Sequence, residues 1–106
     1  MTADRSNLPL SGEELHTLGD VRAAIDRLDD ELVPLLCARL VAIRRAAELK
    51  NEPADALVEW RVEEVADRVR RRALGTGGDA DLAERIWRGM MDECIAYERA
   101  AIAARG

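Results

Sequence analysis

The sequence predicts an all-α fold of three helices per chain, one long and two shorter. Ala, Arg, Leu and Glu are abundant in its 106 residues, and Phe is absent, which favours helices. Apolar residues recur at intervals of three and four, the helical period, and no alternating β pattern occurs. Two turn-like segments, NEPADA (51–56) and GTGGD (75–79), divide this pattern into three.

The first helix is expected to be long. Ser11 and Glu14 fit a capping box, and the apolar repeat then continues without a turn cluster. We therefore expect a helix from about Glu14 to Leu49. Pro34 lies in its middle and should bend it, because proline removes one backbone hydrogen bond. The alternative is a break at Pro34 that lets the chain fold back as a monomeric bundle.

The second and third helices are shorter. The second is expected over about Val58 to Leu74, and the glycines of 75–79 should end it because Gly adopts the left-handed closing conformation. Asp79 or Asp81 should cap the third helix. The residues expected to face inward are Val58, Val62, Val65, Val69 and Ala73 from the second helix, and Leu82, Ile86, Met90, Cys94 and Tyr97 or Glu98 from the third.

The length of the first helix predicts a homodimer. A helix from Glu14 to Leu49 would be about 54 Å long at 1.5 Å per residue. A compact domain of this size has a radius of gyration of only about 13 Å. Two short helices cannot cover so long an apolar stripe, so we expect a second copy to cover it in an intertwined helical homodimer.

Composition and charge limit the other partners. The net charge of −5 argues against nucleic acid, because nucleic-acid binders usually present a basic face. No apolar run approaches the roughly 18 residues of a membrane span, so no membrane partner is expected. Cys37 and Cys94 lack metal-ligand spacing, which favours a reducing, cytoplasmic setting without metal or cofactor. Residues 1–13 should form a flexible tail and residues 14–106 one helical domain.

Cations on the face of the first helix that should be buried indicate an anion site. Arg39 and Lys50 differ by only about 20° around the helix and about 16 Å along it. Arg22 lies about 25 Å from Arg39, so only a partner chain's copy could join them. Arg61, near the start of the second helix, is a fourth candidate. Several cations in one pocket imply a small dianion, because isolated buried cations would each cost on the order of several kcal/mol.

Four segments resemble the all-helical (AroQ-type) chorismate mutase family, which includes isochorismate-pyruvate lyases and 4-amino-4-deoxychorismate mutases. They are VRAAIDRLDDELVPLLCARL, ELK, WRVEEV and IWRGMMDECIAYE, within about residues 15–100. An Arg, the motif I-D-x-L-D, an Arg seventeen residues after the first, a Lys eleven further and a second-helix Arg follow in the family's order. The resemblance implies the intertwined AroQ dimer and a pericyclic rearrangement of chorismate to prephenate that needs no cofactor.

The resemblance also implies a role for each charged residue. Arg39 and the partner's Arg22 would clamp the two carboxylates of the substrate. Lys50 would donate to the ether oxygen and a carboxylate, and Arg61 would support the substrate. Glu98 could donate a hydrogen bond to the ether oxygen only when protonated, so activity should rise as the pH falls. The expected catalytic residues are therefore Lys50, Glu98 and Arg39.

The remaining expected contacts depart from the family pattern. Val62 stands where a glutamate usually grips the ring hydroxyl, Val58 or Glu59 stands where an acidic residue is usual, and Cys94 replaces a common serine. The Arg-Val pair at 61–62 resembles the lyase and aminodeoxychorismate branches, so rearrangement of the 4-amino analogue and pyruvate elimination from isochorismate are alternatives. A third alternative is a weakly active, mutase-like dimerisation or regulatory module that needs an activating partner enzyme.

Overall fold

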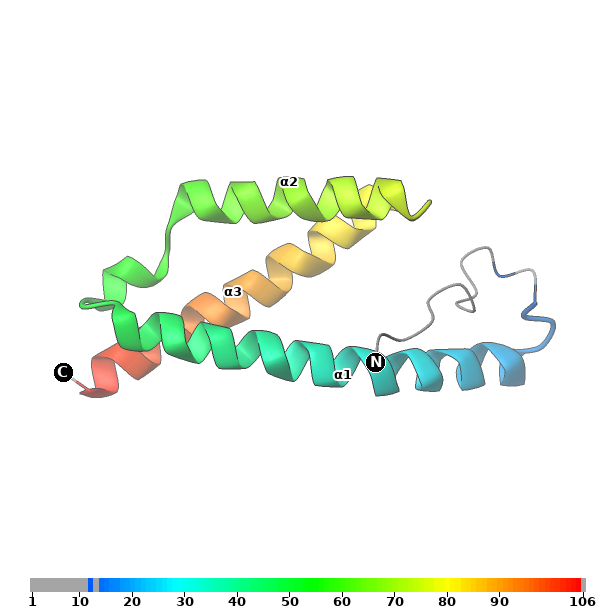
Figure 1. The fold of residues 1–106 in the computed structure, drawn as a ribbon, viewed down its shortest axis with the longest axis horizontal. Helices are drawn as coiled ribbons and strands as arrows, with labels where there is room; N and C mark the ends of the chain where they lie inside the picture. Colours follow the sequence, from blue (N-terminus) through cyan, green and yellow to red (C-terminus); the bar gives the residue numbers. More distant parts are fainter. Residues whose placement is uncertain (1–11, 13, 106) are drawn as a thin grey trace. The chain divides into compact units, whose positions relative to one another are not determined.

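A computed structural model describes residues 12 and 14–105, which form three α-helices and one short 3₁₀ helix (Figure 1). The elements are α1 (Leu18–Leu49), η2 (Pro53–Ala56), α2 (Glu59–Gly75) and α3 (Ala80–Arg105). No strand occurs among these residues, which confirms the all-α class. The chain divides into two compact units after Cys37. The homodimer stays a prediction, and the expected N-terminal tail lies outside the described residues except for Gly12.

The start of α1 is set by a capping box at Thr17 and Asp20. The Thr17 hydroxyl oxygen accepts from the Asp20 backbone N–H at 3.0 Å, and the Asp20 carboxylate accepts from the Thr17 N–H at 3.2 Å. The helix therefore begins at Leu18, and the expected start near Glu14 is wrong because Glu14 lies in a turn. Ser11, the expected cap, lies outside the described residues.

The first unit contains the first half of α1. The helix continues through Pro34, so the alternative of a break there is wrong, and the expected bend stays a prediction. Large apolar side chains are exposed along this half-helix: Leu18, Ile25, Leu32, Val33, Leu35 and Leu36. Such a concentration of exposed apolar residues is typical of an interaction surface. Leu32 and Leu35 are 55% and 53% exposed in the single chain.

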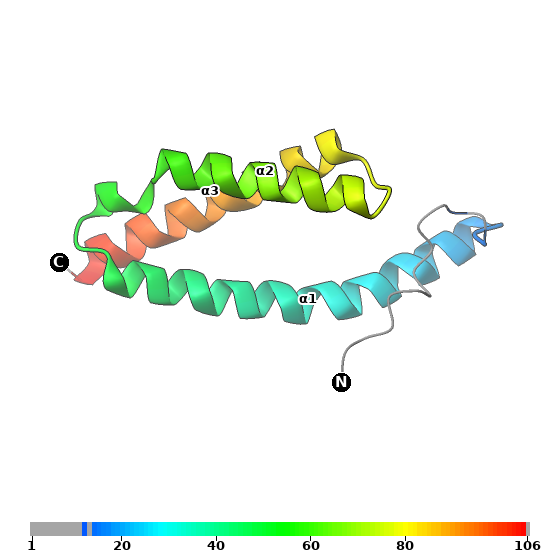
Figure 2. The same cartoon turned by 45° about the horizontal axis from the view of Figure 1, so that its top comes forward.

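The second unit contains the rest of α1 with η2, α2 and α3. Helices α2 and α3 lie side by side, joined by a tight turn (Figure 2). The turn is a Schellman motif, in which the Gly78 N–H donates to the Ala73 carbonyl at 2.8 Å and the Gly77 N–H donates to the Leu74 carbonyl at 3.1 Å. Gly77 has a φ of 77°, as expected for the closing glycine. Helix α2 begins and ends one residue later than predicted.

The cap of α3 is Asp79, one of the two predicted residues. Its carboxylate accepts from the Leu82 backbone N–H at 3.0 Å. Asp81 instead belongs to an ion-pair network between α2 and α3. Arg70 contacts Asp81 at 2.7 Å and Glu84 at 3.0 Å. Arg88 contacts Glu84 at 2.7 Å and Glu63 at 2.7 Å.

The inward face of α3 differs in part from the prediction. Its buried residues are Ala80, Met91, Cys94, Glu98 and Ile102. Glu98 rather than Tyr97 faces inward. Leu82 and Ile86 are exposed in the single chain, so this expectation is wrong. Residues four apart drift by about 40° per step around a helix, which puts Leu82 about 120° from Cys94.

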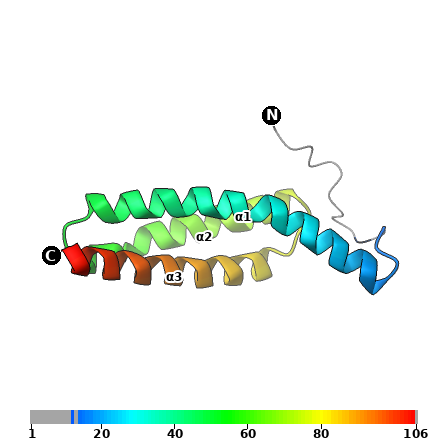
Figure 3. The same cartoon turned by 90° about the horizontal axis from the view of Figure 1, so that it is seen from below.

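The end of α1 is anchored by the last turn of α3, which lies beside it (Figure 3). The Arg105 guanidinium donates to the Ala47 carbonyl at 2.7 Å and also to the Lys50 carbonyl. Carbonyls at a helix C-terminus have no partner within the helix, and a cation is favourable there. Separately, no helix in the part of the chain that the structure describes is long and apolar enough to cross a membrane.

Candidate functional site

A cavity of about 370 Å³ lies within the second unit, among the second half of α1, η2, α2 and α3. Its volume falls in the range of about 300–1,000 Å³ typical of small-molecule sites. Seven residues expected for the site line it: Arg39, Lys50, Val58, Arg61, Val62, Cys94 and Glu98. The charged residues among its lining are three cations and one carboxylate, a formal excess of two positive charges.

An ion pair joins Lys50, the first residue after α1, to α3 at one wall of this cavity. The Lys50 Nζ donates to the Glu98 Oε1 at 2.8 Å, and Glu98 is only 4% exposed. A buried carboxylate requires a charged or hydrogen-bonding partner. The Nζ also lies 3.5 Å from the Ala56 carbonyl of η2, which it can donate to. Sequence reasoning selected Lys50 and Glu98 but did not predict that they pair.

The position of Lys50 depends on the two elements that follow α1. Arg105, described above, holds the carbonyl of Lys50 itself. The 3₁₀ helix η2 is capped at its N-terminus by Asp55, whose carboxylate accepts from the Glu52 backbone N–H at 3.0 Å. It ends at Ala56, the residue whose carbonyl faces the lysine. Arg105 was missed by sequence reasoning, since no local pattern connects a basic residue near the end of α3 with the end of α1.

The two cavity arginines differ in their partners. The Arg39 Nη1 donates to the Cys94 Sγ at 3.6 Å, and no carboxylate pairs with Arg39 among residues 12 and 14–105. Arg61 contacts Glu64 at 2.6 Å, one turn along α2, with both side chains at least half exposed. Exposed pairs of this kind contribute little to stability. An anionic ligand can therefore take either guanidinium without breaking a buried ion pair.

Two of the expected site residues do not line the cavity. Glu59 lies in the first turn of α2 and is exposed. Arg22 is exposed on the first half of α1, in the other unit, so its role in a partner's site stays a prediction. Sequence reasoning did not assign the other lining residues to the site; they are Ala42, Ile43, Ala46, Ala56, Trp60, Val65, Met91 and Ile95. Most lie three or four residues from an expected one, which is the signal that could have found them.

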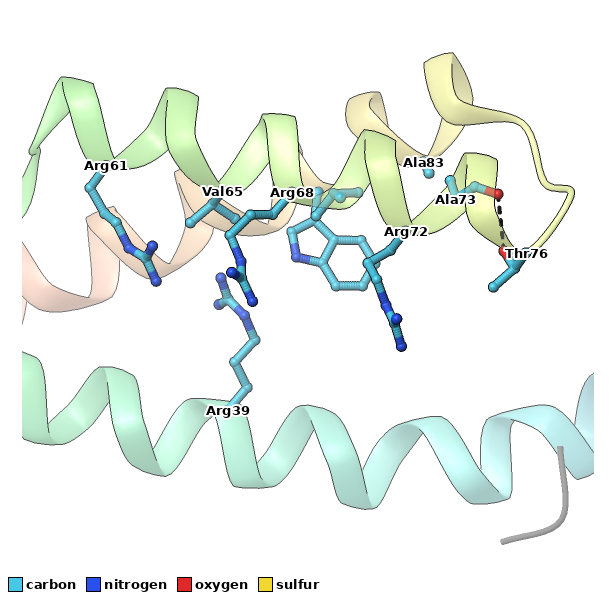
Figure 4. Close-up of a pocket in the computed structure, with 10 residues that line it drawn as sticks. Arg39, Arg61, Val65, Arg68, Arg72, Ala73, Thr76 and Ala83 are labelled. Atoms are coloured by element: carbon cyan, nitrogen blue, oxygen red, sulfur yellow. Dashed lines mark hydrogen bonds between the residues drawn. The ribbon is translucent and has the colours of Figure 1, made fainter. Parts of the chain in front are cut away.

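A second cavity, of about 490 Å³, shares Arg39, Arg61 and Val65 with the first and extends along α2. Its further cationic residues are Arg68 and Arg72. Figure 4 shows Arg61, Arg68 and Arg72 projecting from α2 on the side that faces Arg39. Val69, Ala73, Thr76, Ala83 and Trp87 complete the lining. The spacing of seven and four residues in α2 could have predicted this row of arginines.

Comparison with known proteins yielded one match. A family model described as chorismate mutase type II matches residues 21–99, which include Arg22, the cavity cations and Glu98. Neither the curated proteins nor the solved structures gave a match. In addition, no group of three or more His, Cys, Asp or Glu that could hold a metal ion occurs in the described part of the chain.

Proposed function

The chain belongs to the chorismate mutase type II family, and from this premise we propose that it rearranges chorismate to prephenate. Family membership supports chorismate mutase-type activity or a close relative. The observation that best supports the specific reaction is the set of Arg39, Lys50 and Arg61 around one cavity. With Glu98 as the one carboxylate of the lining, the formal charge of +2 complements a dianionic substrate.

The proposed reaction needs positioning and charge rather than a nucleophile. In the pericyclic step one C–O bond breaks while one C–C bond forms, and no atom or electron pair leaves the substrate. The protein therefore has to hold the dianion in its folded, reactive conformer. Arg39 and Arg61 are suited to this task because a guanidinium fork matches the geometry of a carboxylate.

Lys50 is the proposed donor to the ether oxygen, on which negative charge develops as the C–O bond breaks. Its contacts with Glu98 and the Ala56 carbonyl support this role, because they restrict the ammonium group before substrate binds. Glu98 is proposed as a second donor. A charged carboxylate would repel the ether oxygen, so Glu98, which pairs with Lys50 as a carboxylate in the free protein, can act as a donor only after it takes up a proton. The rate should then rise as the pH falls, whereas Glu98→Gln should remove this rise.

A second candidate reaction is favoured by two apolar residues of the lining. Val62 lines the cavity where the family resemblance expects a glutamate that holds the ring hydroxyl, and Val58, which also lines it, is with Glu59 one of the two candidates for a further position that is usually acidic. A site without that acceptor gains little from the hydroxyl of chorismate. This favours pyruvate elimination from isochorismate, or rearrangement of the 4-amino analogue, as the alternative activity.

Product identification tests these reactions directly. The purified protein is incubated with chorismate, isochorismate and 4-amino-4-deoxychorismate in turn, and the products are identified by mass spectrometry. Prephenate would support the leading proposal, and salicylate with pyruvate would support the lyase. Lys50→Ala should abolish turnover, while Arg71→Ala, at an exposed pair with Asp67 outside both cavities, should not. No turnover by the folded protein would contradict all three, and restored turnover with an added partner enzyme would support the regulatory alternative.

We also propose that each site is shared between two protomers, with the partner's Arg22 as a further carboxylate ligand. Mixing Arg22→Ala with Lys50→Ala protein tests this proposal. Each hybrid dimer would have one intact site and one doubly impaired site. At equal proportions and free exchange, about a quarter of all sites would be intact. No recovery after confirmed subunit exchange would contradict the shared site.

A further inference from the structure

We propose that Arg68 and Arg72 bind Asp26 and Asp29 of a second copy of this chain, so that these charges fix the register of the homodimer. The inference rests on the proposed function in one respect, because it places the partner's Arg22 near the first cavity. Arg68 and Arg72 line the second cavity, of about 490 Å³, which forms a groove along α2.

The groove has more positive charge than its own chain neutralises. Arg68 and Arg72 have no ion-pair partner among residues 12 and 14–105. Both point to the side of α2 that faces Arg39 (Figure 4). Cations that converge without an anion repel one another, and the repulsion grows as water is excluded. The apolar lining of Val69, Ala73 and Trp87 further favours a partner that is amphipathic.

The first half of α1 has a matching acidic face. At 100° per residue, Asp29 lies about 20° and Asp26 about 40° from Arg22 around the helix. All three side chains are exposed in the single chain. Val33, which is 54% exposed, lies on the same face. This half-helix can therefore present two carboxylates and an apolar residue together with Arg22.

The spacing along the two helices also matches. Asp26 and Asp29 lie about 6 Å and 10.5 Å beyond Arg22 along the helix axis. On α2, Arg68 and Arg72 lie about 10.5 Å and 16.5 Å beyond Arg61. A partner helix that runs parallel to α2, with its Arg22 about one turn past Arg61, therefore brings Asp26 near Arg68 and Asp29 near Arg72.

Charge reversal in two complementary variants tests the pairing. R68E/R72E and D26R/D29R are each studied as the full chain by sedimentation velocity in 50 mM NaCl. The dissociation constant of the dimer should be at least about tenfold higher for each variant alone than for wild type, because like charges then meet in both grooves. A 1:1 mixture should restore dimers. In the heterodimer one groove pairs the introduced glutamates with the introduced arginines, and the other retains the native pairs.

Matched controls lie on the same two helices. Glu31 is about 180° from Arg22 around α1, and Arg71 lines neither cavity. E31R and R71E should therefore dimerise like wild type. A single chain that combines all four reversals should also dimerise, and circular dichroism should confirm its helix content. Raising NaCl to 500 mM should weaken the wild-type dimer through screening.

The results separate this inference from the proposed function. Undiminished dimerisation of R68E/R72E, failure of the mixture to form heterodimers, or a monomeric wild type would overturn the pairing. Turnover of chorismate by wild type without such complementation would leave the proposed function intact. Complementation by a protein that converts none of the three substrates would support the pairing and contradict the function.

Discussion

Replacing Lys50 with methionine tests the buried ion pair of the candidate site. The change keeps most of the side-chain volume but leaves the Glu98 carboxylate, 4% exposed, without its cation. Removing one partner of a buried pair costs about 3–5 kcal/mol, because the remaining charge is uncompensated. The Lys50 side chain is itself 25% exposed, so water can screen part of the effect. We therefore expect a loss of about 3 kcal/mol in the free energy of unfolding.

A second variant separates the contribution of the two charges to stability from the contribution of side-chain packing. Lys50→Met combined with Glu98→Leu removes both charges, and an apolar pair of similar volume is often neutral or stabilising. The double variant should therefore be about 2 kcal/mol more stable than Lys50→Met alone. Arg45→Met is the matched control, in the last turns of α1 just before Lys50. Its exposed pair with Glu48 should contribute less than about 1 kcal/mol.

Urea unfolding at pH 7, followed by circular dichroism, measures these differences. All variants must be compared at one protein concentration, because the stability of a dimerising chain depends on it. A loss below about 1 kcal/mol for Lys50→Met would refute the reasoning. Additive losses in the double variant would do the same, because they would show that the two charges do not interact.

Three further predictions concern the frame around the site. Arg105→Ala should lower the free energy of unfolding by about 1–2 kcal/mol, because two carbonyls at the end of α1 lose their donor. The same variant should also have a lower kcat. Arg105→Lys should restore part of the stability and part of kcat. Arg88 and then Arg70 hold the pKa of Glu84 below its usual value of 4.5 by hydrogen bonding. The lowered pKa of Glu84 stabilises the folded state above pH 4.5, and this contribution is lost as the pH falls through the lowered pKa. Arg88→Met lacks much of this contribution, so its melting temperature should fall less steeply between pH 5 and 3 than that of wild type. Gly77→Ala should cost about 1–2 kcal/mol at its positive φ, whereas Gly89→Ala, with open space at its Cβ inside α3, should stabilise by about 0.5–1 kcal/mol in thermal unfolding.

The fold was predictable where the signals are local. Helix class follows from the apolar period, and the end of α2 follows from the left-handed conformation that Gly77 adopts. The start of α1 was harder, because the patterns Ser11–Glu14 and Thr17–Asp20 both resemble capping boxes. The structure shows the capping hydrogen bonds of the second pattern, and Ser11 of the first lies outside the described residues.

The site was predictable in its charges but not in its pairings. Arg39 and Lys50 stand out because they lie on a face that should be apolar. Their partners Cys94 and Glu98 are 55 and 48 residues away in sequence, and these contacts depend on the rotation of α3. A repeat of four residues predicted the wrong rotation of α3 at Leu82 and Ile86, which are exposed in the single chain. Arg105 has no sequence signal because its acceptors are backbone carbonyls, which every residue has.

Two adjoining cavities with common members have a practical consequence for protein engineering. Arg39 and Arg61 border both, so a library that varies either residue alters two surfaces in one step. Val58 and Val62 line the smaller cavity alone. Selection for a new ring substituent is therefore best begun at these two valines, where polar side chains can be sampled while the arginine row along α2 is kept unchanged.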